Sequence, residues 1–473
     1  MPEHLPPLLT ALGAVVVAAP AALVAVLGAS SLIDRKLSER ATARAVAAAT
    51  VVGLLAAAGV FVGMLAGDTR HVVVEFGDWV HVETPPPEPH YHFAVKFVFD
   101  RLSVPFAALS LALCGVIGAF AHRYMHREPG YNRFFTLYAL FLAGMVTTAA
   151  AGTIETLFLG WELVGLSGAL LVGFFHGRPA PVGNALRVWA VYRASDAALL
   201  LAAVLLHHLS GEGDLDQVTG YHAGHAGHES VGAAAWPSGR CPLTESQVLA
   251  VGGLLLVAAV GKSALVPFSG WLPRAMEGPT PSSAVFYGAL SVHLGAFLLL
   301  RAGPLLDASP VLSGAAVLLG LATAGFATLA GRVQTDIKSA LSFASLAQVG
   351  LIVAEIGVGW RYVPLTHLLG HACLRTLQFV RAPSAIRDHH GLENALGDRV
   401  PRAAGAGGGW VYRFALERGY LDALLDRFVA GPFVRLFRGC DRLERRWTSA
   451  LAGSPDPRSV PPAPRPADTE RPV

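Results

Sequence analysis

Apolar runs long enough to cross a lipid bilayer recur along most of this chain, and they constrain its fold more than any other feature. Each run holds roughly 18–23 mostly apolar residues, enough for a helix to span a hydrocarbon core of ~30 Å. We expect eleven spans, at about 8–30, 45–67, 101–121, 134–151, 154–175, 186–207, 247–268, 281–301, 311–330, 337–356 and 363–381. Because backbone groups in lipid must be satisfied internally, we predict an all-α, polytopic membrane bundle of about eleven transmembrane helices.

The composition excludes several classes of protein. Hydrophobic residues make up 53% of the chain and charged residues 15%, whereas a soluble domain carries about 25% charged residues. The net charge of +3 gives no reason to expect nucleic-acid binding. We find no nucleotide-binding loop, nucleophile elbow or redox-centre motif. The cysteines are too widely spaced for a CxxC metal site; they are Cys114, Cys241, Cys373 and Cys440. We therefore expect no cofactor and no metal in this chain itself.

Basic residues lie in alternate loops between the expected spans. They are Arg35, Lys36, Arg40, Arg44, Arg123, Arg127, Arg133, Arg178, Arg187, Arg274, Arg332 and Lys338. Cytoplasmic loops carry such an excess, so an odd number of spans places the N-terminus outside and the C-terminus in the cytoplasm. No Lys or Arg precedes the first apolar run, which we interpret as the first helix rather than a cleaved leader.

The chain divides by composition into four parts. Residues 1–382 hold the spans, 383–409 form a Gly/Ala linker, 410–450 interleave apolar residues with arginines, and 451–473 are rich in Pro, Arg and Asp. The third part predicts one or two amphipathic helices, broken at Gly431–Pro432, on the inner membrane surface or against a partner. The fourth part should be disordered.

Two segments between spans carry patterns of their own. Residues 72–76 and 79–82 are rich in β-formers, and they flank Gly77–Asp78, which predicts a small hairpin around that pair. Residues 209–246 form a long polar loop. Its three regularly spaced histidines are His222, His225 and His228. Their spacing resembles a metal site, but a flexible Gly/Ala loop gives them no rigid frame, so we disfavour one.

Ionisable residues inside the expected spans are the most informative feature for function. Glu162 lies in the fifth span, with Glu155 seven residues earlier on the same face. Arg193 and Asp196 are three apart in the sixth span, so they can pair. Lys262 lies in the seventh span, and four prolines follow it at positions 267, 273, 279 and 281. That span must therefore break, which membranes tolerate only where protein or water surrounds the break.

The later spans add a second set of polar residues. His293 lies in the eighth span, and Lys338 begins the tenth. His367, His371 and Arg375 are spaced by four in the eleventh span, which places them on one stripe of a helix.

Structural explanations stay open for several of these residues. The ion pair of the sixth span and the stripe of the eleventh can serve helix packing alone, Lys338 can extend to the inner surface, and His293 can be a buried, hydrogen-bonded histidine. Glu162 and Lys262 are harder to explain in this way, because a charge at the bilayer centre costs about 2.5–3.5 kcal/mol. A row of Glu, Lys, Asp and His inside a membrane is what a proton relay needs.

Several strings occur in order along residues 95–382: Phe99–Ser103, Gly160–Glu162, Val164–Leu166, Arg193–Asp196, Gly261–Ala264, Trp271–Leu272, Ala275–Met276, Gly278–Ala284, Gln334–Lys338, and His367 with His371. In these strings the chain resembles subunit L of bacterial NADH–quinone oxidoreductase (complex I), which is related to cation/proton antiporter subunits. The resemblance implies a proton-translocating, antiporter-like membrane domain in the cell inner membrane of a bacterium.

The resemblance also implies roles for the buried residues. Glu162 and Lys262 would be the key pair of a half-channel, with Asp196 near Lys262. The candidate proton pathway comprises Glu162, Lys262, Asp196, Arg193, Lys338, His293, His367, His371 and Arg375. The chain departs from the family at Tyr287, where a histidine is usual, and at Arg375, where a lysine is usual. Arginine hardly deprotonates, so a relay through Arg375 is disfavoured.

The second antiporter repeat is shorter here than in the family. It normally has about five helices and a second key lysine, whereas residues 420–433 already resemble a segment near the family's C-terminus. We interpret this as an internal loss of helices twelve to about fourteen. Shortened relatives include the membrane subunit of two-component inorganic carbon uptake systems, the DabB type, which pairs with a large cytoplasmic zinc protein resembling a carbonic anhydrase.

Three readings follow from the resemblance. The chain is a proton pump subunit of a respiratory complex, a proton-coupled carbon-uptake subunit, or a scaffold that has lost transport and anchors a cytoplasmic partner. In each reading its partners are the lipid bilayer and other subunits of a hetero-oligomeric complex. Quinone, NADH or zinc would enter only through partner subunits.

Overall fold

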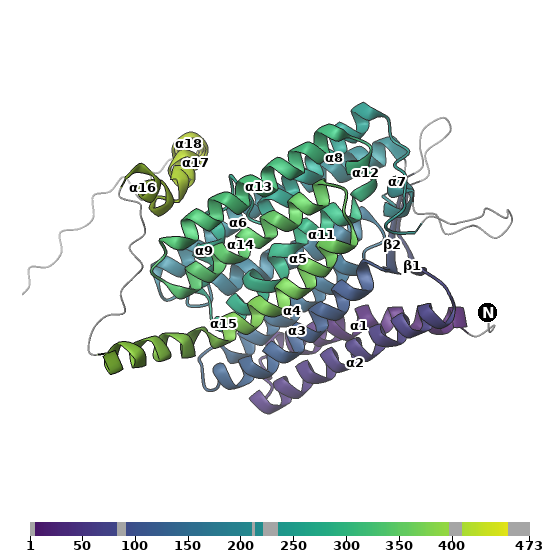
Figure 1. The fold of residues 1–473 in the computed structure, drawn as a ribbon, viewed down its shortest axis with the longest axis horizontal. Helices are drawn as coiled ribbons and strands as arrows, with labels where there is room; N and C mark the ends of the chain where they lie inside the picture. The colour runs from purple at the N-terminus through teal and green to yellow at the C-terminus, as the bar shows by residue number, and fades with distance from the viewer. Residues whose placement is uncertain (1–4, 83–90, 211–212, 221–234, 397–408, 453–473) are drawn as a thin grey trace, which may run out of the picture. The chain divides into compact units, whose positions relative to one another are not determined.

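The computed structural model describes residues 5–82, 91–210, 213–220, 235–396 and 409–452 (Figure 1). Our predictions for His222, His225 and His228 and for most of the 451–473 tail lie outside these residues. The chain forms two compact units, Met1–Leu416 and Glu417–Val473, which we describe separately.

The first unit is a bundle of helices that lie alongside one another (Figure 1). Among the described residues, ten helices are long and apolar enough to cross a membrane. They are α1 (Leu5–Leu32), α2 (Glu39–Ala66), α3 (Ser103–Tyr124), α4 (Tyr131–Ala150), α5 (Ile154–Val172), α6 (Pro179–Ser210), α8 (Glu245–Lys262), the segment Thr280–Arg301, α13 (Pro310–Arg332) and α14 (Ile337–Gly357). The prediction of an all-α polytopic membrane bundle is confirmed.

The eleventh predicted span is a helix, but it is less apolar than the other ten. Residues 363–381 lie in α15 (Tyr362–Leu396), which packs against α14. Its His367, His371, Arg375 and Gln378 lower its hydropathy. The helix also runs to Leu396, so the first half of the segment predicted as a linker, 383–409, is helical. The Ala, Leu, Glu and Arg residues there favour a helix, and the Gly-rich part begins only at about Ala404.

The span around Lys262 breaks as predicted. Helix α8 ends at Lys262, Ser263 caps it, and Ala264 adopts a left-handed φ of +56°. The chain becomes helical again in α9 (Trp271–Arg274) and η1 (Ala275–Glu277). The freed backbone groups have partners, because Trp271 Nε1 donates to the carbonyl of Gly261 at 2.9 Å and Val266 N–H donates to Thr323 Oγ1 at 3.1 Å.

The next span is also irregular. It consists of α10 (Thr280–Ser282), the π-helix η2 (Ser283–Leu290), the short 3₁₀-helix η3 (Ser291–His293) and α11 (Leu294–Arg301). All of its residues are buried. π-helical turns are frequent at functional sites.

The hairpin differs from our prediction. Strand β1 (His71–Val82) is continuous through Gly77–Asp78 and pairs antiparallel with β2 (Tyr91–Asp100). The register shifts between Glu75 and Asp78, and Gly77 has a φ of +93°. This is the geometry of a β-bulge with glycine at its left-handed position, so the pair marks a bulge and not the turn.

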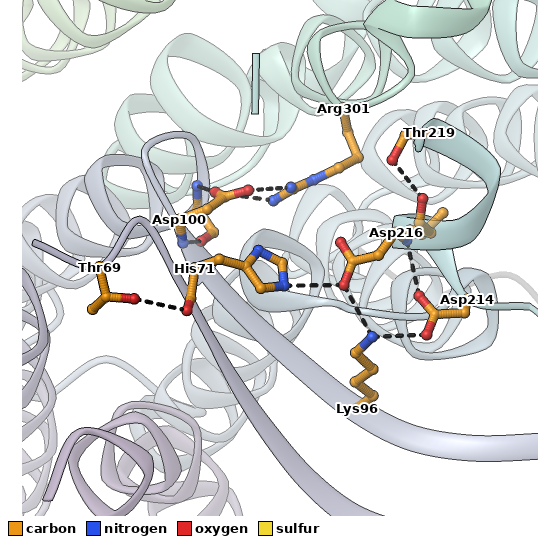
Figure 2. A network of polar contacts seen from close by, with 10 residues as sticks. Thr69, His71, Lys96, Asp100, Asp214, Asp216, Thr219 and Arg301 are labelled. Atoms are coloured by element: carbon orange, nitrogen blue, oxygen red, sulfur yellow. Dashed lines mark hydrogen bonds and ion pairs between the residues drawn. The ribbon is translucent and has the colours of Figure 1, made fainter. Parts of the chain in front are cut away.

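The hairpin and α7 (Leu215–Thr219) lie together at one end of the bundle, which we call the hairpin end (Figure 1). Lys96 Nζ lies 2.7 Å from Asp214 Oδ2 and 2.9 Å from Asp216 Oδ2, and His71 Nε2 lies 3.1 Å from the same Asp216 oxygen (Figure 2). Burial alone would lower the pKa of Lys96, but Asp216 and Asp214 outweigh it and raise that pKa. Burial would raise the pKa of Asp216, but His71 and Lys96 outweigh it and lower that pKa. Lys96 and Asp216 are therefore fixed charges that tie β2 to α7.

A second ion pair joins the end of β2 to the end of α11. Arg301 Nη1 donates to Asp100 Oδ2 at 2.5 Å, and the two residues are 3% and 1% exposed (Figure 2). Asp100 Oδ1 also accepts from the backbone N–H groups of Leu102 at 2.9 Å and Ser103 at 2.8 Å. Burial would raise the pKa of Asp100, but Arg301 and these donors outweigh it and lower that pKa.

The C-terminal segment is helical, but its break is not where we predicted. Helix α16 (Trp410–Leu416) closes the first unit, and the second holds η4 (Arg418–Tyr420), α17 (Leu421–Leu425), the π-helix η5 (Asp426–Ala430) and α18 (Gly431–Ala452). Gly431 is in helical conformation, whereas Arg418, Gly419 and Tyr420 have positive φ values. The break therefore falls at 418–420, and proline is tolerated at the start of α18 because its missing N–H is not needed there.

Candidate functional site

Lys262, the last residue of α8, is fully buried, with 0% of its surface exposed. Its Nζ donates a hydrogen bond to the backbone carbonyl of Trp161 at 2.8 Å. It also lies 4.8 Å from the ring centroid of Trp161 and 4.5 Å from that of Tyr192, distances at which a cation is attracted to an aromatic face. Gly165 leaves room for the ammonium, because a Cβ there would lie 3.0 Å from Nζ. A carbonyl and two aromatic faces thus hold Lys262.

The predicted carboxylate partners of Lys262 form a group on α5 and α6. The Nη2 group of Arg193 donates two hydrogen bonds. One goes to Glu162 Oε2, and the other goes to Asp196 Oδ2 at 2.8 Å. The other oxygen of Asp196 accepts from Trp161 Nε1 at 2.5 Å. Trp161 therefore connects the two groups, since its indole N–H binds Asp196 while its carbonyl binds Lys262. The predicted pairing of Arg193 with Asp196 is confirmed.

Three of the later residues form a continuous row. His293 Nδ1 lies 2.5 Å from the carbonyl of Ala289, and its Nε2 lies 2.9 Å from His371 Nδ1. His371 Nε2 accepts from Arg375 Nε at 3.0 Å. A carbonyl only accepts, so His293 donates from Nδ1 and accepts at Nε2, and His371 donates from Nδ1. Both imidazoles are then neutral, and each has one donor and one acceptor nitrogen, which suits proton transfer between them.

The row ends at an open groove. His367, one turn from His371 on α15, lies 2.9 Å from Glu355 Oε1 through Nδ1 and 3.0 Å from Gln348 Oε1 through Nε2. These side chains, with His371 and Arg375, line a groove of about 750 Å³ between α14 and α15. The spacing of the predicted stripe therefore does place its residues on one side of a helix.

The structure does not bring all the predicted residues into one row. Lys338 lies half-buried in the first turn of α14, and among the described residues no hydrogen bond or ion pair joins it to either group. Tyr287 and His293 face different neighbours, because Tyr287 donates to the carbonyl of Gly168 on α5 whereas His293 faces α15. Aromatic rings lie between the groups, with Trp271 5.0 Å from Tyr192 and 5.9 Å from Tyr287 between ring centroids.

One pair at the hairpin end was only half predicted. Glu155, in the first turn of α5, accepts a hydrogen bond from His207, near the end of α6. The sequence singled out Glu155 by its spacing from Glu162, but His207 has no spacing relation to it. The only available signal was that a histidine near the end of an expected span needs a polar partner.

These features define a multi-pass membrane protein whose interior holds ionisable groups in hydrogen-bonded clusters around a broken helix. The profile described as "NADH:quinone oxidoreductase/Mrp antiporter, TM" matches residues 151–397, just over half of the chain. The profile of the N-terminus of complex I chain 5 matches residues 87–135. The chain belongs to the NADH:quinone oxidoreductase/Mrp antiporter family of membrane subunits.

Individual relatives agree with this assignment. NADH-ubiquinone oxidoreductase chain 5 of Schizophyllum commune is 30% identical over 318 residues, which cover 67% of this chain and 43% of that protein. NADH-quinone oxidoreductase subunit L of Escherichia coli K12 is 30% identical over 304 residues, which cover 64% of this chain and 47% of that protein. The chain thus spans about half the length of the curated relatives it matches.

Two solved structures share the fold. The Mrp complex from Dietzia sp. DQ12-45-1b contains a chain with a TM-score of 0.61 and 24% identity, covering 84% of this chain and 39% of that one. The membrane-bound sulfane sulfur reductase, an archaeal respiratory membrane complex, contains a chain with a TM-score of 0.63 and 17% identity, covering 87% of this chain and 86% of that one. At these identities the likeness shows that the fold is shared.

Proposed function

We propose that this chain is a proton-conducting subunit in which Glu162 and Lys262 are the exchanging pair. The observation that carries the proposal is the fully buried ammonium at a broken membrane helix, joined through Trp161 to the Asp196 and Arg193 group. A buried lysine that is not directly hydrogen-bonded to a carboxylate can lose its proton more easily than one in a tight ion pair. Protonation of Glu162 changes the field at Lys262 and so favours proton movement there.

The other predicted residues continue this path. In the proposal Lys338 and the row of His293 and His371 take the proton further across the bundle, and His367 meets the groove beside α15. Arg375 serves as a fixed donor to His371 and not as a carrier, because its guanidinium stays charged. One proton crossing 100 mV is worth about 2.3 kcal/mol, which a partner could use or supply.

We place the chain in a hetero-oligomeric assembly of a bacterial inner membrane, with its N-terminus outside and its C-terminus in the cytoplasm. The shortened second repeat and the arginine-rich α18 favour an inorganic carbon uptake assembly, in which a large cytoplasmic zinc protein is the partner. A respiratory complex would instead bring NADH and quinone through its other subunits. A scaffold that no longer transports protons is the third candidate.

Transport itself is tested with the assembled complex in membrane vesicles. Lys262→Met and Glu162→Gln should each lower proton flux about a hundredfold or more, the scale expected for loss of a proton-transfer group. Lys36→Gln, which changes an exposed lysine paired with Asp34, is the matched control. If both buried variants assemble and conduct like the parent, the scaffold reading replaces the transport reading.

The identity of the assembly is tested by purifying the tagged protein in mild detergent. A co-purifying zinc protein of the carbonic-anhydrase type supports carbon uptake. Complex I subunits with iron–sulfur proteins would instead contradict carbon uptake and support the respiratory reading.

A further inference from the structure

The hairpin end holds a titratable pair that the pathway above does not use. Glu155 and His207 are hydrogen-bonded between the first turn of α5 and the end of α6. Their side chains are 16% and 8% exposed, so both are largely withdrawn from solvent. Glu155 Oε2 and His207 Nδ1 are buried and have no hydrogen-bond partner within the described part of the chain.

The pair lies on the same helix faces as the Glu162 group. Glu155 precedes Glu162 by seven residues on α5, which is two turns and a rise of ~10 Å. His207 follows Asp196 by eleven residues on α6, which is three turns on the same face. Glu162 Oε1, like Glu155 Oε2, is buried with no partner among the described residues. Two acid–base groups therefore lie along one interface between α5 and α6. Glu155 and His207 lie at its hairpin end, and Glu162 with Asp196 lies deeper in the bundle.

The neighbouring charges at the hairpin end are engaged in contacts of their own. Ile154 N–H donates to the carbonyl of Gly213 at 2.8 Å, which holds the loop before α7 against the start of α5. Glu155 fills the space beside Gly213, where a Cβ would lie 2.0 Å from Oε1. The other charged groups at the hairpin end include Lys96, which is ion-paired with both Asp214 and Asp216 (Figure 2).

From this arrangement we infer that Glu155 and His207 form the proton-exchange station through which Glu162 equilibrates with water at the hairpin end. The inference rests on the proposed function and deepens it. A proton from water neutralises the Glu155 carboxylate, and water molecules between the helices pass it to Glu162. Glu155 then returns to the anion that His207 stabilises, and release follows the reverse order. One proton moves and no covalent bond between heavy atoms changes.

The pH profile of proton flux tests this role. Without the station Glu162 takes protons directly from water, so its loading rate follows the proton concentration. Glu155→Gln should therefore make the flux fall close to tenfold for each unit of rising pH, whereas the parent stays flatter because the pair supplies protons locally. His207→Gln should steepen the profile in the same direction, and Glu155→Asp should restore part of the parent profile.

Controls separate the possible outcomes. Glu245→Gln, which changes an exposed first-turn glutamate of α8, should leave the profile unchanged. If Glu155→Gln lowers the flux by the same factor at every pH, the pair is structural and the inference is wrong. If Lys262→Met stops the flux while Glu155→Gln keeps the parent profile, the proposed function stands and the station fails. If Lys262→Met has no effect in an intact assembly, the proposed function fails first.

Discussion

Arg301→Met should be one of the most destabilising single changes in this protein, although it lies outside the candidate pathway. The substitution keeps an unbranched side chain in place of the arginine stem but removes the guanidinium from Asp100, which is 1% exposed. Breaking a buried pair by removing one partner costs about 3–5 kcal/mol. Asp100 keeps two backbone donors, so we expect the lower end, about 3 kcal/mol, which is roughly a hundredfold in the folding equilibrium.

The double variant with Asp100→Asn shows whether the cost comes from the stranded charge. Asparagine retains an oxygen for the backbone N–H groups but carries no charge, so the double variant should recover about 2 kcal/mol of the loss. The measurement is equilibrium unfolding in mild detergent, followed by tryptophan fluorescence. Lys36→Met, which removes an exposed ion pair with Asp34, should have no measurable effect. Equal losses in the single and double variants would refute the electrostatic argument.

The same pair sets a pH dependence. Because the folded-state pKa of Asp100 is lowered, its stabilisation is present above the unfolded value of about 4 and is lost as the pH falls through the folded value. The gap between the parent and Arg301→Met should therefore be widest at neutral pH and narrow in acid. A gap that stays constant down to pH 3 would contradict this reasoning.

Two further changes test the site directly. Gly165→Ala places a Cβ 3.0 Å from Lys262 Nζ, so the ammonium must shift and proton flux should fall several-fold. The control Gly314→Ala, whose new Cβ meets nothing within 4 Å, should leave the flux unchanged. Equal flux in both variants would refute a role for the position of the Lys262 ammonium. Trp161→Phe removes the 2.5 Å donor to Asp196 while leaving the backbone carbonyl that binds Lys262. A hydrogen bond to a charged group is worth about 1.5–3 kcal/mol, so the flux should fall at least about tenfold. Full flux in an assembled variant would show that this link is dispensable.

The sequence predicted the features that follow from local spacing. The helices, the break after Lys262, the pairing of Arg193 with Asp196 and the common face of His367 and His371 all depend on residues close together in the chain. Each is a consequence of helical periodicity or of proline chemistry. These are the features on which the structure agrees with the sequence.

The sequence could not predict contacts that depend on tertiary proximity or on the backbone. Lys96 meets Asp214 and Asp216 across more than a hundred residues, and each alone resembles an ordinary surface charge. The carbonyl that binds Lys262 belongs to the backbone of Trp161, and a carbonyl has no sequence pattern.

Two local predictions failed because one pattern fits two structures. A Gly–Asp pair between β-rich runs occurs both in hairpin turns and in bulges, and only the pairing partner of β1 distinguishes them. Gly431–Pro432 suits both the end and the start of a helix. The positive φ values at 418–420 decide between them here.

The contacts of Arg193 imply an order of events in the proposed mechanism. Its guanidinium is permanently charged and donates to both Glu162 and Asp196, so it stabilises both carboxylates as anions. A proton on Glu162 removes one attraction and leaves Arg193 bound to Asp196 alone. Asp196 is then better neutralised by Arg193, which weakens its pull on Lys262 and makes loss of the lysine proton easier. Loading of Glu162 should therefore precede release from Lys262, and both steps depend on an arginine that does not itself exchange a proton.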